Sequence, residues 1–326
     1  MESASPPTRP QITTERKPLR GLVAATYTPM DDKGAVLFDR IGPMVEHLVT
    51  IGVEGLFPCG STGEGLSLTT EEREQVTETL ISANAGRLPV AVHVGHNSVR
   101  DACRLAAHAE SHAADAIASI APGFYKPNSA AELVSFLHEI ALAASATPLF
   151  YYHFPARVST NIALEEILEL GLGISNFAGV KYTHNDFDEL GKCRERYAGR
   201  YDLLFGRDEL FLKSLQHGFV DFVGSTYNHA IPIFLALRQA FEAGDDAECL
   251  RLQGVVDELL DLIISVPAFS GQKFLMEASG FDCGPSRCPL PRLDAATAAR
   301  ARRRFDAILA SVASPPAPSE PRLAKV

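Results

Sequence analysis

One lysine of this chain stands in a segment that is otherwise apolar. Lys181 lies within FAGVKYT, which spans residues 177–183. Burying an ammonium group is costly, so an apolar setting favours the neutral amine. A neutral amine attacks carbonyl carbons and forms Schiff bases, which makes Lys181 a candidate nucleophile. The alternative is a lysine at the end of a strand whose ammonium group reaches solvent.

A glycine-rich turn offers a second chemical feature. The turn is GSTGE at residues 60–64, and it contains Ser61 and Thr62. Glycines permit a tight turn, and free N–H groups beside two hydroxyls can hold a carboxylate or a phosphate. The turn lacks the lysine and the spacing of a P-loop, and it does not match GxGxxG. The alternative is an ordinary turn between a strand and a helix.

Three more side chains follow apolar segments and could take part in chemistry. Tyr152 offers a phenol that can relay protons, or it is a core aromatic residue like its neighbours. Asp208 and Glu209 can accept hydrogen bonds from sugar hydroxyls. Acidic residues at this kind of position also commonly stabilise the start of a helix, which is the alternative for one of the two.

Four histidines raise the alternative of a metal-dependent barrel hydrolase, namely His93, His153, His184 and His229. Zinc favours a few histidines together with a carboxylate such as Asp208. However, the segment AATYTPM at residues 24–30 contains no HxH pair, and HExxH does not occur in the chain. We therefore predict no metal site and interpret the histidines as structural.

Eight apolar, β-branched or aromatic segments alternate with stretches of helical periodicity. Strands are expected at residues 22–29, 53–59, 89–94, 116–120, 148–153, 177–183, 201–205 and 219–225. Such alternation predicts parallel strands joined by right-handed crossovers. Eight units favour an α/β fold of the closed (β/α)8 TIM-barrel type over an open sheet. In these barrels the chemistry lies at the carboxyl ends of the strands, where the residues above would meet.

The helical pattern continues after the last expected strand. Residues 247–264 carry an apolar stripe wide enough for a buried helix, and a final helix is expected at 294–312. Between the second and third expected strands, Thr69 and Glu72 have the spacing of a capping box, which marks the start of a helix. We predict a flexible tail at 1–18, a catalytic barrel at 19–245, a C-terminal helical extension at 246–313 and a flexible tail at 314–326.

Composition excludes several classes of partner. The chain has 326 residues, and its formal net charge of −10 argues against nucleic acid and against a membrane surface. Its apolar runs are far shorter than the roughly 18 residues that span a bilayer, and the first 20 residues lack the apolar region of a secretory signal. The six cysteines form no CxxC pair, so we expect reduced thiols and a cytoplasmic protein.

Several motifs, taken together, resemble the pyruvate-dependent class I aldolases, the family that includes N-acetylneuraminate lyase and dihydrodipicolinate synthase. The resemblance covers roughly residues 20–295 and rests on GLVAATYTPM (21–30), GSTGEGLSL (60–68), HVG (93–95), YYHFP (151–155), GVKYT (179–183), FGRDE (205–209), GSTYN (224–228) and GPSRCPLP (284–291). It implies a (β/α)8 barrel with a C-terminal helical extension, usually a homotetramer. It also implies a small 2-oxo acid substrate such as pyruvate and no metal or organic cofactor.

The same resemblance assigns roles to residues of this sequence. Lys181 matches the Schiff-base lysine, Tyr152 matches the tyrosine that relays protons, and Ser61 and Thr62 match the turn that holds the keto-acid carboxylate and passes protons. FGRDE and GSTYN are most similar to the neuraminate lyases. That similarity implies reversible cleavage of N-acetylneuraminate to pyruvate and N-acetylmannosamine, with the open-chain substrate contacted by Thr183, Gly206, Asp208, Glu209 and Ser225.

One position departs from the lyase pattern and another from the synthase pattern. Arg157 stands where the lyases have leucine and where the synthases have an arginine that binds a second carboxylate. This keeps a dihydrodipicolinate synthase or another pyruvate-dependent 2-oxo acid aldolase open as an alternative, beside a non-catalytic sugar-acid binding barrel. Phe124 stands where the synthases donate a tyrosine across a subunit interface, and Tyr125 follows it.

Overall fold

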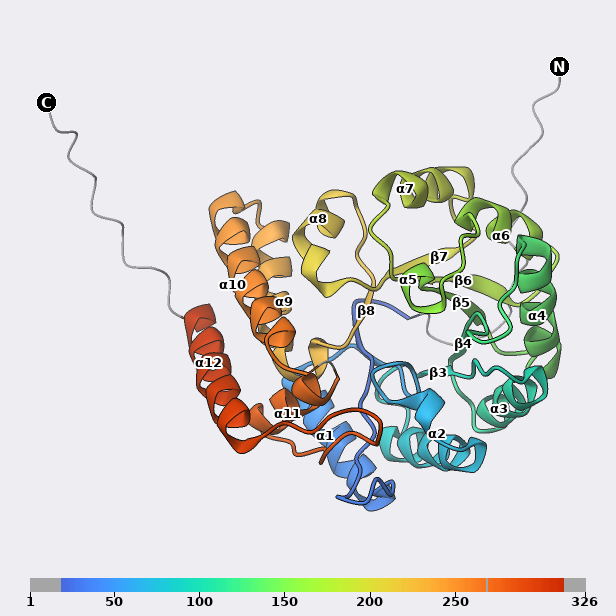
Figure 1. The fold of residues 1–326 in the computed structure, drawn as a ribbon. Helices are drawn as coiled ribbons and strands as arrows, with labels where there is room; N and C mark the ends of the chain where they lie inside the picture. Colours follow the sequence, from blue (N-terminus) through green and yellow to red (C-terminus); the bar gives the residue numbers. More distant parts are fainter. Residues whose placement is uncertain (1–18, 268, 314–326) are drawn as a thin grey trace, which may run out of the picture.

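Eight parallel strands form a single closed sheet. The computed structural model describes residues 19–267 and 269–313, so the two predicted tails lie outside the described residues. The strands are β1 Leu22–Ala24, β2 Gly55–Leu56, β3 Ala91–His93, β4 Ala116–Ile120, β5 Leu149–His153, β6 Phe177–Tyr182, β7 Asp202–Phe205 and β8 Phe222–Gly224. Their order is β2-β1-β8-β7-β6-β5-β4-β3, and a parallel bridge between Leu56 and Val90 closes the ring. The predicted (β/α)8 barrel is confirmed (Figure 1).

Helices surround the barrel and follow its strands in sequence. They are α1 Ile41–Ile51, α2 Thr70–Asn84, α3 Val99–Ser111, α4 Ala130–Ala143, α5 Pro155–Val158, α6 Leu164–Gly171, α7 Phe187–Arg196, α8 Phe211–Gln216 and α9 Tyr227–Glu242. Short 3₁₀ turns, η1 Phe38–Arg40, η2 Gly65–Ser67 and η3 Asp208–Leu210, lie within three of the loops. The capping box of α2 forms as predicted, because Thr69 Oγ1 accepts from Glu72 N at 3.2 Å and Glu72 Oε2 accepts from Thr69 N at 2.9 Å.

All eight strands lie where the sequence predicts them, but several are shorter. The first was expected at 22–29 and ends at Ala24. Beyond it, Met30 pairs with Val36 in an antiparallel bridge outside the sheet. The apolar run therefore includes residues that are buried by loops rather than by strand pairing, which hydropathy alone does not distinguish.

Two apolar clusters hold the barrel together. The larger one fills the space between the sheet and the helices. The smaller one fills the interior of the ring, with Phe57, Phe150 and Leu204 among its largest members. Because side chains fill the interior of the ring, a ligand can bind only at the carboxyl ends of the strands.

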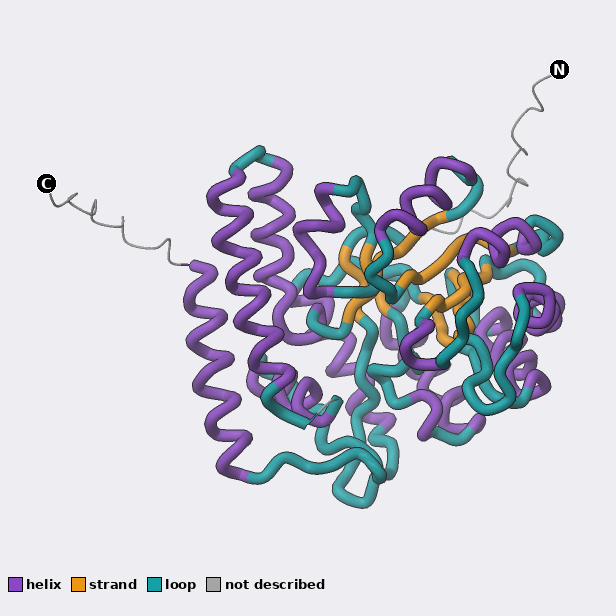
Figure 2. The backbone as a smooth tube through the Cα atoms, turned by 45° about the horizontal axis from the view of Figure 1, so that its top comes forward, coloured by secondary structure: helices purple, strands orange, loops and turns teal. Residues whose placement is uncertain are grey.

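Three further helices pack beside the barrel, namely α10 Asp246–Ile264, α11 Ser270–Ala278 and α12 Ala295–Ala313. Figure 2 shows α9, α10 and α12 as long neighbouring helices on one side of the molecule. The predicted apolar stripe of α10 is buried, including Leu252, Val256 and Leu259. Among the described helices, none combines the length and the apolar composition needed to cross a bilayer.

Candidate active site

A register shift in the sheet turns Lys181 toward the inside of the barrel. Leu149 of β5 pairs with Phe177 of β6, but the next residue, Phe150, pairs with Gly179, so Ala178 is skipped. Ala178 belongs to the interior cluster. Side chains of a regular strand alternate between its two faces, so an inward Ala178 would place Lys181 on the outer face. The register shift places Lys181 on the inner face instead, as bulges beside active sites commonly do.

Two aromatic rings surround the amine of Lys181. The Nζ atom lies 4.1 Å from the centre of the Tyr152 ring and 4.4 Å from that of Phe57. Lys181 is 5% exposed, and Tyr152 is its direct partner in the register between β5 and β6. The predicted apolar surroundings of this lysine are therefore present, and its amine reaches the floor of a cavity rather than the outer surface.

The turn at residues 60–64 lies beside this amine with its backbone held tightly. Gly65 N donates to Gly60 O at 3.0 Å, and Thr28 Oγ1 donates to Gly63 O at 2.7 Å. A Cβ atom at Gly65 would lie only 1.8 Å from Cys59 O, so this position requires glycine. In the described part of the chain, no acceptor receives the backbone N–H of Ser61 or Thr62. These donors and the two hydroxyls are available to a carboxylate.

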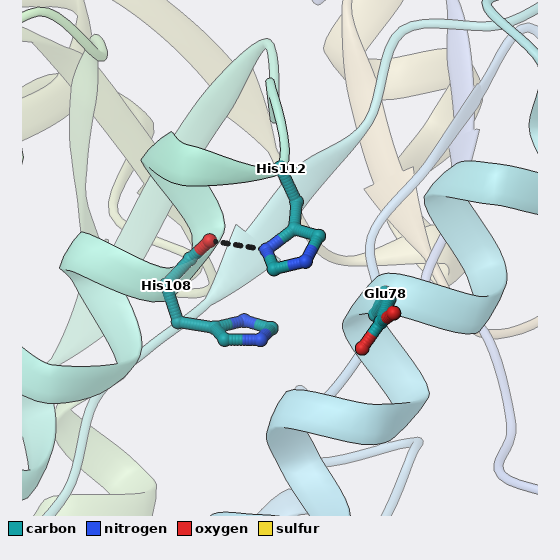
Figure 3. A group of neighbouring side chains, drawn as sticks. All are labelled: Glu78, His108 and His112. Carbon is teal, nitrogen blue, oxygen red and sulfur yellow. Dashed lines mark hydrogen bonds between the residues drawn. The ribbon is translucent and has the colours of Figure 1, made fainter.

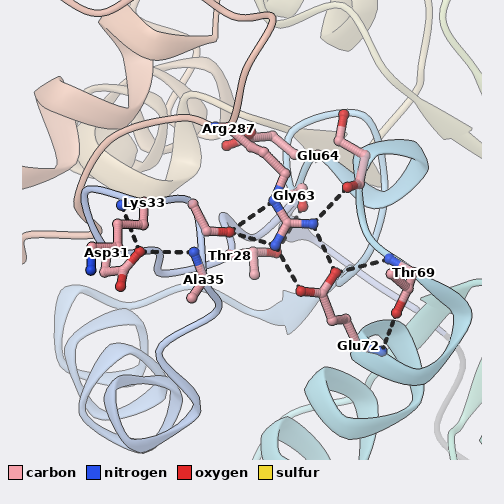
Figure 4. A network of polar contacts seen from close by, with 11 residues as sticks. Thr28, Asp31, Lys33, Ala35, Gly63, Glu64, Thr69, Glu72 and Arg287 are labelled. Atoms are coloured by element: carbon pink, nitrogen blue, oxygen red, sulfur yellow. Dashed lines mark hydrogen bonds and ion pairs between the residues drawn. The ribbon is translucent and has the colours of Figure 1, made fainter.

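Two residues of the C-terminal extension, one on α11 and one in the segment that follows it, hold the far end of this turn. Lys273 of α11 donates to Glu64 Oε1 at 3.1 Å, and both side chains are almost fully buried. Arg287 N donates to Glu64 Oε2 at 2.8 Å. The Arg287 guanidinium binds both carboxylate oxygens of Glu72 at the start of α2, as Figure 4 shows. The turn is therefore held from residues more than 200 positions away in sequence.

Asp208 lies at the back of the site in a buried position. Its Oδ2 accepts from Thr226 Oγ1 at 2.6 Å and from Thr226 N at 3.1 Å, while Oδ1 has no partner among the described residues. Burial raises the pKa of the Asp208 carboxyl, and the two bonds from Thr226 oppose that rise. The free oxygen is an acceptor for a ligand hydroxyl.

Replacing Asp208 by asparagine is expected to separate stability from binding. Because the folded-state pKa of Asp208 is raised, the folded chain loses stability as pH rises through that value, and a neutral amide at this position removes the loss. We compare the free energies of unfolding of Asp208→Asn and of the parent, measured in urea. The difference should favour the variant more at pH 8 than at pH 4. Its KM for a polyhydroxylated substrate should rise about tenfold, because a charged acceptor is lost. An equal stability difference at both pH values would contradict this assignment.

The other residues predicted to contact the hydroxylated part of the substrate lie near Asp208. Thr183 Oγ1 is buried without a partner among the described residues, and a Cβ atom at Gly206 would lie 2.2 Å from it. Gly206 thus leaves room for the Thr183 hydroxyl. Glu209 is partly exposed, and its carboxylate accepts from Arg207 Nε at 2.6 Å. Ser225 follows β8 and is partly exposed.

One cavity of about 200 Å³ brings these side chains together. It is lined by all ten residues predicted from the sequence: Ser61, Thr62, Tyr152, Arg157, Lys181, Thr183, Gly206, Asp208, Glu209 and Ser225. An amine, a phenol, a guanidinium, four hydroxyls and two carboxylates thus line one cavity. This arrangement can bind an acid at one end and hydroxyl groups at the other, with a nucleophile between them.

Four lining residues from the C-terminal helices were not predicted as part of the site. Leu260 and Ile263 come from α10, and Phe269 and Gln272 come from the start of α11. The apolar pattern of α10 indicates that Leu260 and Ile263 pack against something, but not that they face a ligand. Phe269 and Gln272 carry no signal in the sequence, because their place depends on how the extension folds back on the barrel.

Arg157 stands at the mouth of this cavity on α5. Its guanidinium carbon lies 5.2 Å from the centre of the Phe269 ring and 5.7 Å from that of Phe154. No carboxylate of the described residues pairs with it, and its side chain is exposed. A second cavity of about 320 Å³ begins at the same arginine and at Ser61. Arg157 is therefore available to an anionic group at the entrance.

Of the four histidines weighed as metal ligands, only His153 and His184 are neighbours in the described structure, with ring centres 6.2 Å apart. His153 stacks on Tyr182, with ring centres 5.2 Å apart, and His229 packs against Phe305 of α12. His93 accepts from Ile120 N at 3.3 Å, and burial together with the charges of Arg73 and Lys181 holds its pKa well below the usual value. These rings support the barrel wall.

Known proteins similar to this chain place it in one family. The sequence model of the dihydrodipicolinate synthetase family matches residues 18–308. N-acetylneuraminate lyase of Mus musculus is 38% identical over 299 residues, which cover 90% of this chain and 93% of that protein. Solved structures of N-acetylneuraminate lyases from Proteus mirabilis and Aliivibrio salmonicida are each 34% identical, with TM-scores of 0.86 and 0.87. They cover 89% and 90% of this chain, and 98% and 97% of their own chains. The chain belongs to the dihydrodipicolinate synthetase family.

Proposed function

We propose that this protein is a class I aldolase that reversibly cleaves N-acetylneuraminate to pyruvate and N-acetylmannosamine. The observation that carries the proposal is the buried amine of Lys181 beside Tyr152, in a cavity that also contains Asp208 and Glu209. The lyases compared above, which match almost the whole chain, support sialic acid as the substrate. The catalytic residues are Lys181, Tyr152 and Ser61, and no metal or organic cofactor is needed, because the lysine supplies the covalent chemistry.

The reaction begins with capture of the open-chain substrate. The free N–H groups and hydroxyls of Ser61 and Thr62 hold its carboxylate, which places the C2 ketone near Lys181. The neutral amine attacks C2, and loss of water gives an imine. Thr183, Gly206, Asp208, Glu209 and Ser225 receive the hydroxylated tail. Orientation of this kind lowers a reaction barrier by several kcal/mol.

Bond cleavage follows from the imine. Once protonated, the imine accepts the electron pair of the C3–C4 bond, while the proton on the C4 hydroxyl leaves through Tyr152 with help from Ser61. N-acetylmannosamine departs as the aldehyde and an enamine remains on Lys181. Protonation of the enamine at C3 and hydrolysis of the new imine release pyruvate and restore the amine.

Arg157 is the feature that supports a second candidate within the family. Its guanidinium has no described carboxylate partner, so it could hold the carboxylate of aspartate semialdehyde, as in a dihydrodipicolinate synthase. In the sialic-acid reaction we propose that Arg157 attracts the anionic substrate to the cavity entrance. The two roles differ in the aldehyde that the enzyme accepts.

Supplying each substrate to the purified chain distinguishes the two candidates. We expect pyruvate release from N-acetylneuraminate, measured with a coupled NADH-dependent reductase, and the reverse condensation from pyruvate and N-acetylmannosamine. Condensation of pyruvate with aspartate semialdehyde should be at least about a hundredfold less efficient in kcat/KM, which corresponds to a difference of about 2.8 kcal/mol. Turnover of the semialdehyde without cleavage of sialic acid would reverse the ranking.

We further propose a cytoplasmic homotetramer. All six cysteines are unpaired, which supports a reducing compartment. Phe124 and Tyr125 are 75% and 82% exposed, and Leu66, beside the second cavity, is 63% exposed. Asn97 Oδ1 accepts from the backbone N–H groups of Gly123 and Phe124 and so fixes the loop that carries these rings. Apolar side chains held rigidly in solvent support contact with another subunit.

A further inference from the structure

A group of metal-ligand side chains lies on the outer surface of the barrel, away from the catalytic cavity. His108 and His112 belong to the last turn of α3 and its cap, four residues apart, so their rings lie on one face of the helix. Glu78 faces them from the neighbouring helix α2, as Figure 3 shows. One ligand atom from each of the three residues lies within 4.8 Å of the others.

The ring of His112 is held in the orientation that metal ligands commonly have. Its Nδ1 lies 2.9 Å from the backbone oxygen of His108, which fixes the proton on Nδ1 and leaves the lone pair of Nε2 free. Metal-binding histidines usually donate their second ring N–H to a carbonyl or carboxylate in this way. The two rings are stacked, with centres 4.1 Å apart.

The carboxylate of Glu78 is free to complete the group. Two other glutamates of α2 bind Arg104 instead. Arg104 donates to Glu71 Oε1 at 2.9 Å, and to Oε1 and Oε2 of Glu74 at 2.8 and 2.6 Å. Within the part of the chain that the structure describes, Glu78 makes no hydrogen bond or ion pair, and its side chain is exposed. A tetrahedral ion with ligand distances of about 2.0–2.2 Å separates its ligand atoms by about 3.3–3.6 Å. Rotation of the exposed glutamate, together with rotation of the His108 ring out of its stack on His112, brings the three ligand atoms to this spacing.

We propose that Glu78, His108 and His112 bind one Zn²⁺ or a similar late first-row transition-metal ion, with water as the fourth ligand. Two imidazoles and a carboxylate are ligands that such ions accept. The ion would join α2 to α3 on the outside of the barrel. None of the three residues lines the catalytic cavity, so this site is separate from the lysine chemistry.

Titration of the full-length chain with ZnCl₂ in a calorimeter tests the proposal, in a Cys288→Ser background that removes the exposed thiol. One equivalent should bind, and His112→Ala should weaken binding at least about tenfold. His217→Ala is the matched control, because His217 also caps a helix with its Nδ1 2.8 Å from a backbone oxygen four residues earlier. The affinity of the His217→Ala variant for Zn²⁺ should equal that of the parent.

Cobalt spectroscopy identifies the ligands directly. Co²⁺ should give visible d–d absorption without a near-ultraviolet thiolate band, and the absorption should decrease in Glu78→Gln and disappear in His112→Ala. Absence of Zn²⁺ binding would overturn the proposal. Equal weakening by His112→Ala and His217→Ala would also overturn it, because that result indicates dispersed binding to surface histidines.

Discussion

Replacing Lys181 by methionine is expected to lower kcat/KM for sialic-acid cleavage by at least about 10³-fold, because the imine can no longer form. Methionine has a similar length and no charge, and its thioether packs well against aromatic rings such as those of Phe57 and Tyr152. The fold should therefore survive. Since the substitution replaces a buried polar amine by an apolar side chain in apolar surroundings, the Lys181→Met variant should be at least as stable as the parent toward urea.

Tyr152→Phe is the matched control for this experiment. It keeps the amine and the aromatic ring and removes only the phenol oxygen, so imine formation with pyruvate should persist while turnover falls. Steady-state rates and urea unfolding of both variants give the comparison. A Lys181→Met protein that keeps more than about a tenth of the parent kcat/KM would contradict covalent catalysis by this residue, since each tenfold is only about 1.4 kcal/mol of barrier.

Replacing Lys273 by methionine should have the largest effect on stability. The change leaves the carboxylate of Glu64 buried without its cation, and breaking a buried ion pair in this way costs about 3–5 kcal/mol. The turn that presents Ser61 and Thr62 would lose one of its fixed points, so KM for the keto acid should rise in the surviving protein. Urea unfolding and pyruvate-dependent kinetics measure the two effects.

Two further variants define what the Lys273 result means. Arg302→Met removes one partner of an exposed ion pair with Glu277 and should cost less than about 1 kcal/mol. Adding Glu64→Gln to Lys273→Met should restore part of the lost stability, because no unpaired charge then remains buried. If Lys273→Met and Arg302→Met prove equally mild, the ion pair of Lys273 and Glu64 does not stabilise the fold.

The elements of the barrel could be predicted because their signals are local. Apolar segments separated by helical periodicity mark all eight strands, and the Thr69–Glu72 spacing marks the start of α2. The buried face of α10 likewise follows from its stripe of leucine, valine and isoleucine. In each case the residues that carry the signal are those that form the structure.

Features that depend on distant parts of the chain could not be predicted. The orientation of Lys181 rests on a register shift between β5 and β6, which no spacing in the sequence reveals. Lys273 meets Glu64 across 209 positions, and Phe269 reaches the cavity only because the extension folds over the barrel. The ten site residues could be named from motifs, yet the walls that enclose them required the tertiary fold.

The most direct test of the account is reduction of the protein with borohydride in the presence of pyruvate, followed by peptide mass mapping. We predict one covalent adduct with the mass of a reduced pyruvate imine, on the peptide that contains Lys181, and no adduct when pyruvate is omitted. The adduct should be absent from Lys181→Met and present in Tyr152→Phe. An adduct on a different lysine, or none at all, would contradict the central claim that Lys181 captures the ketone.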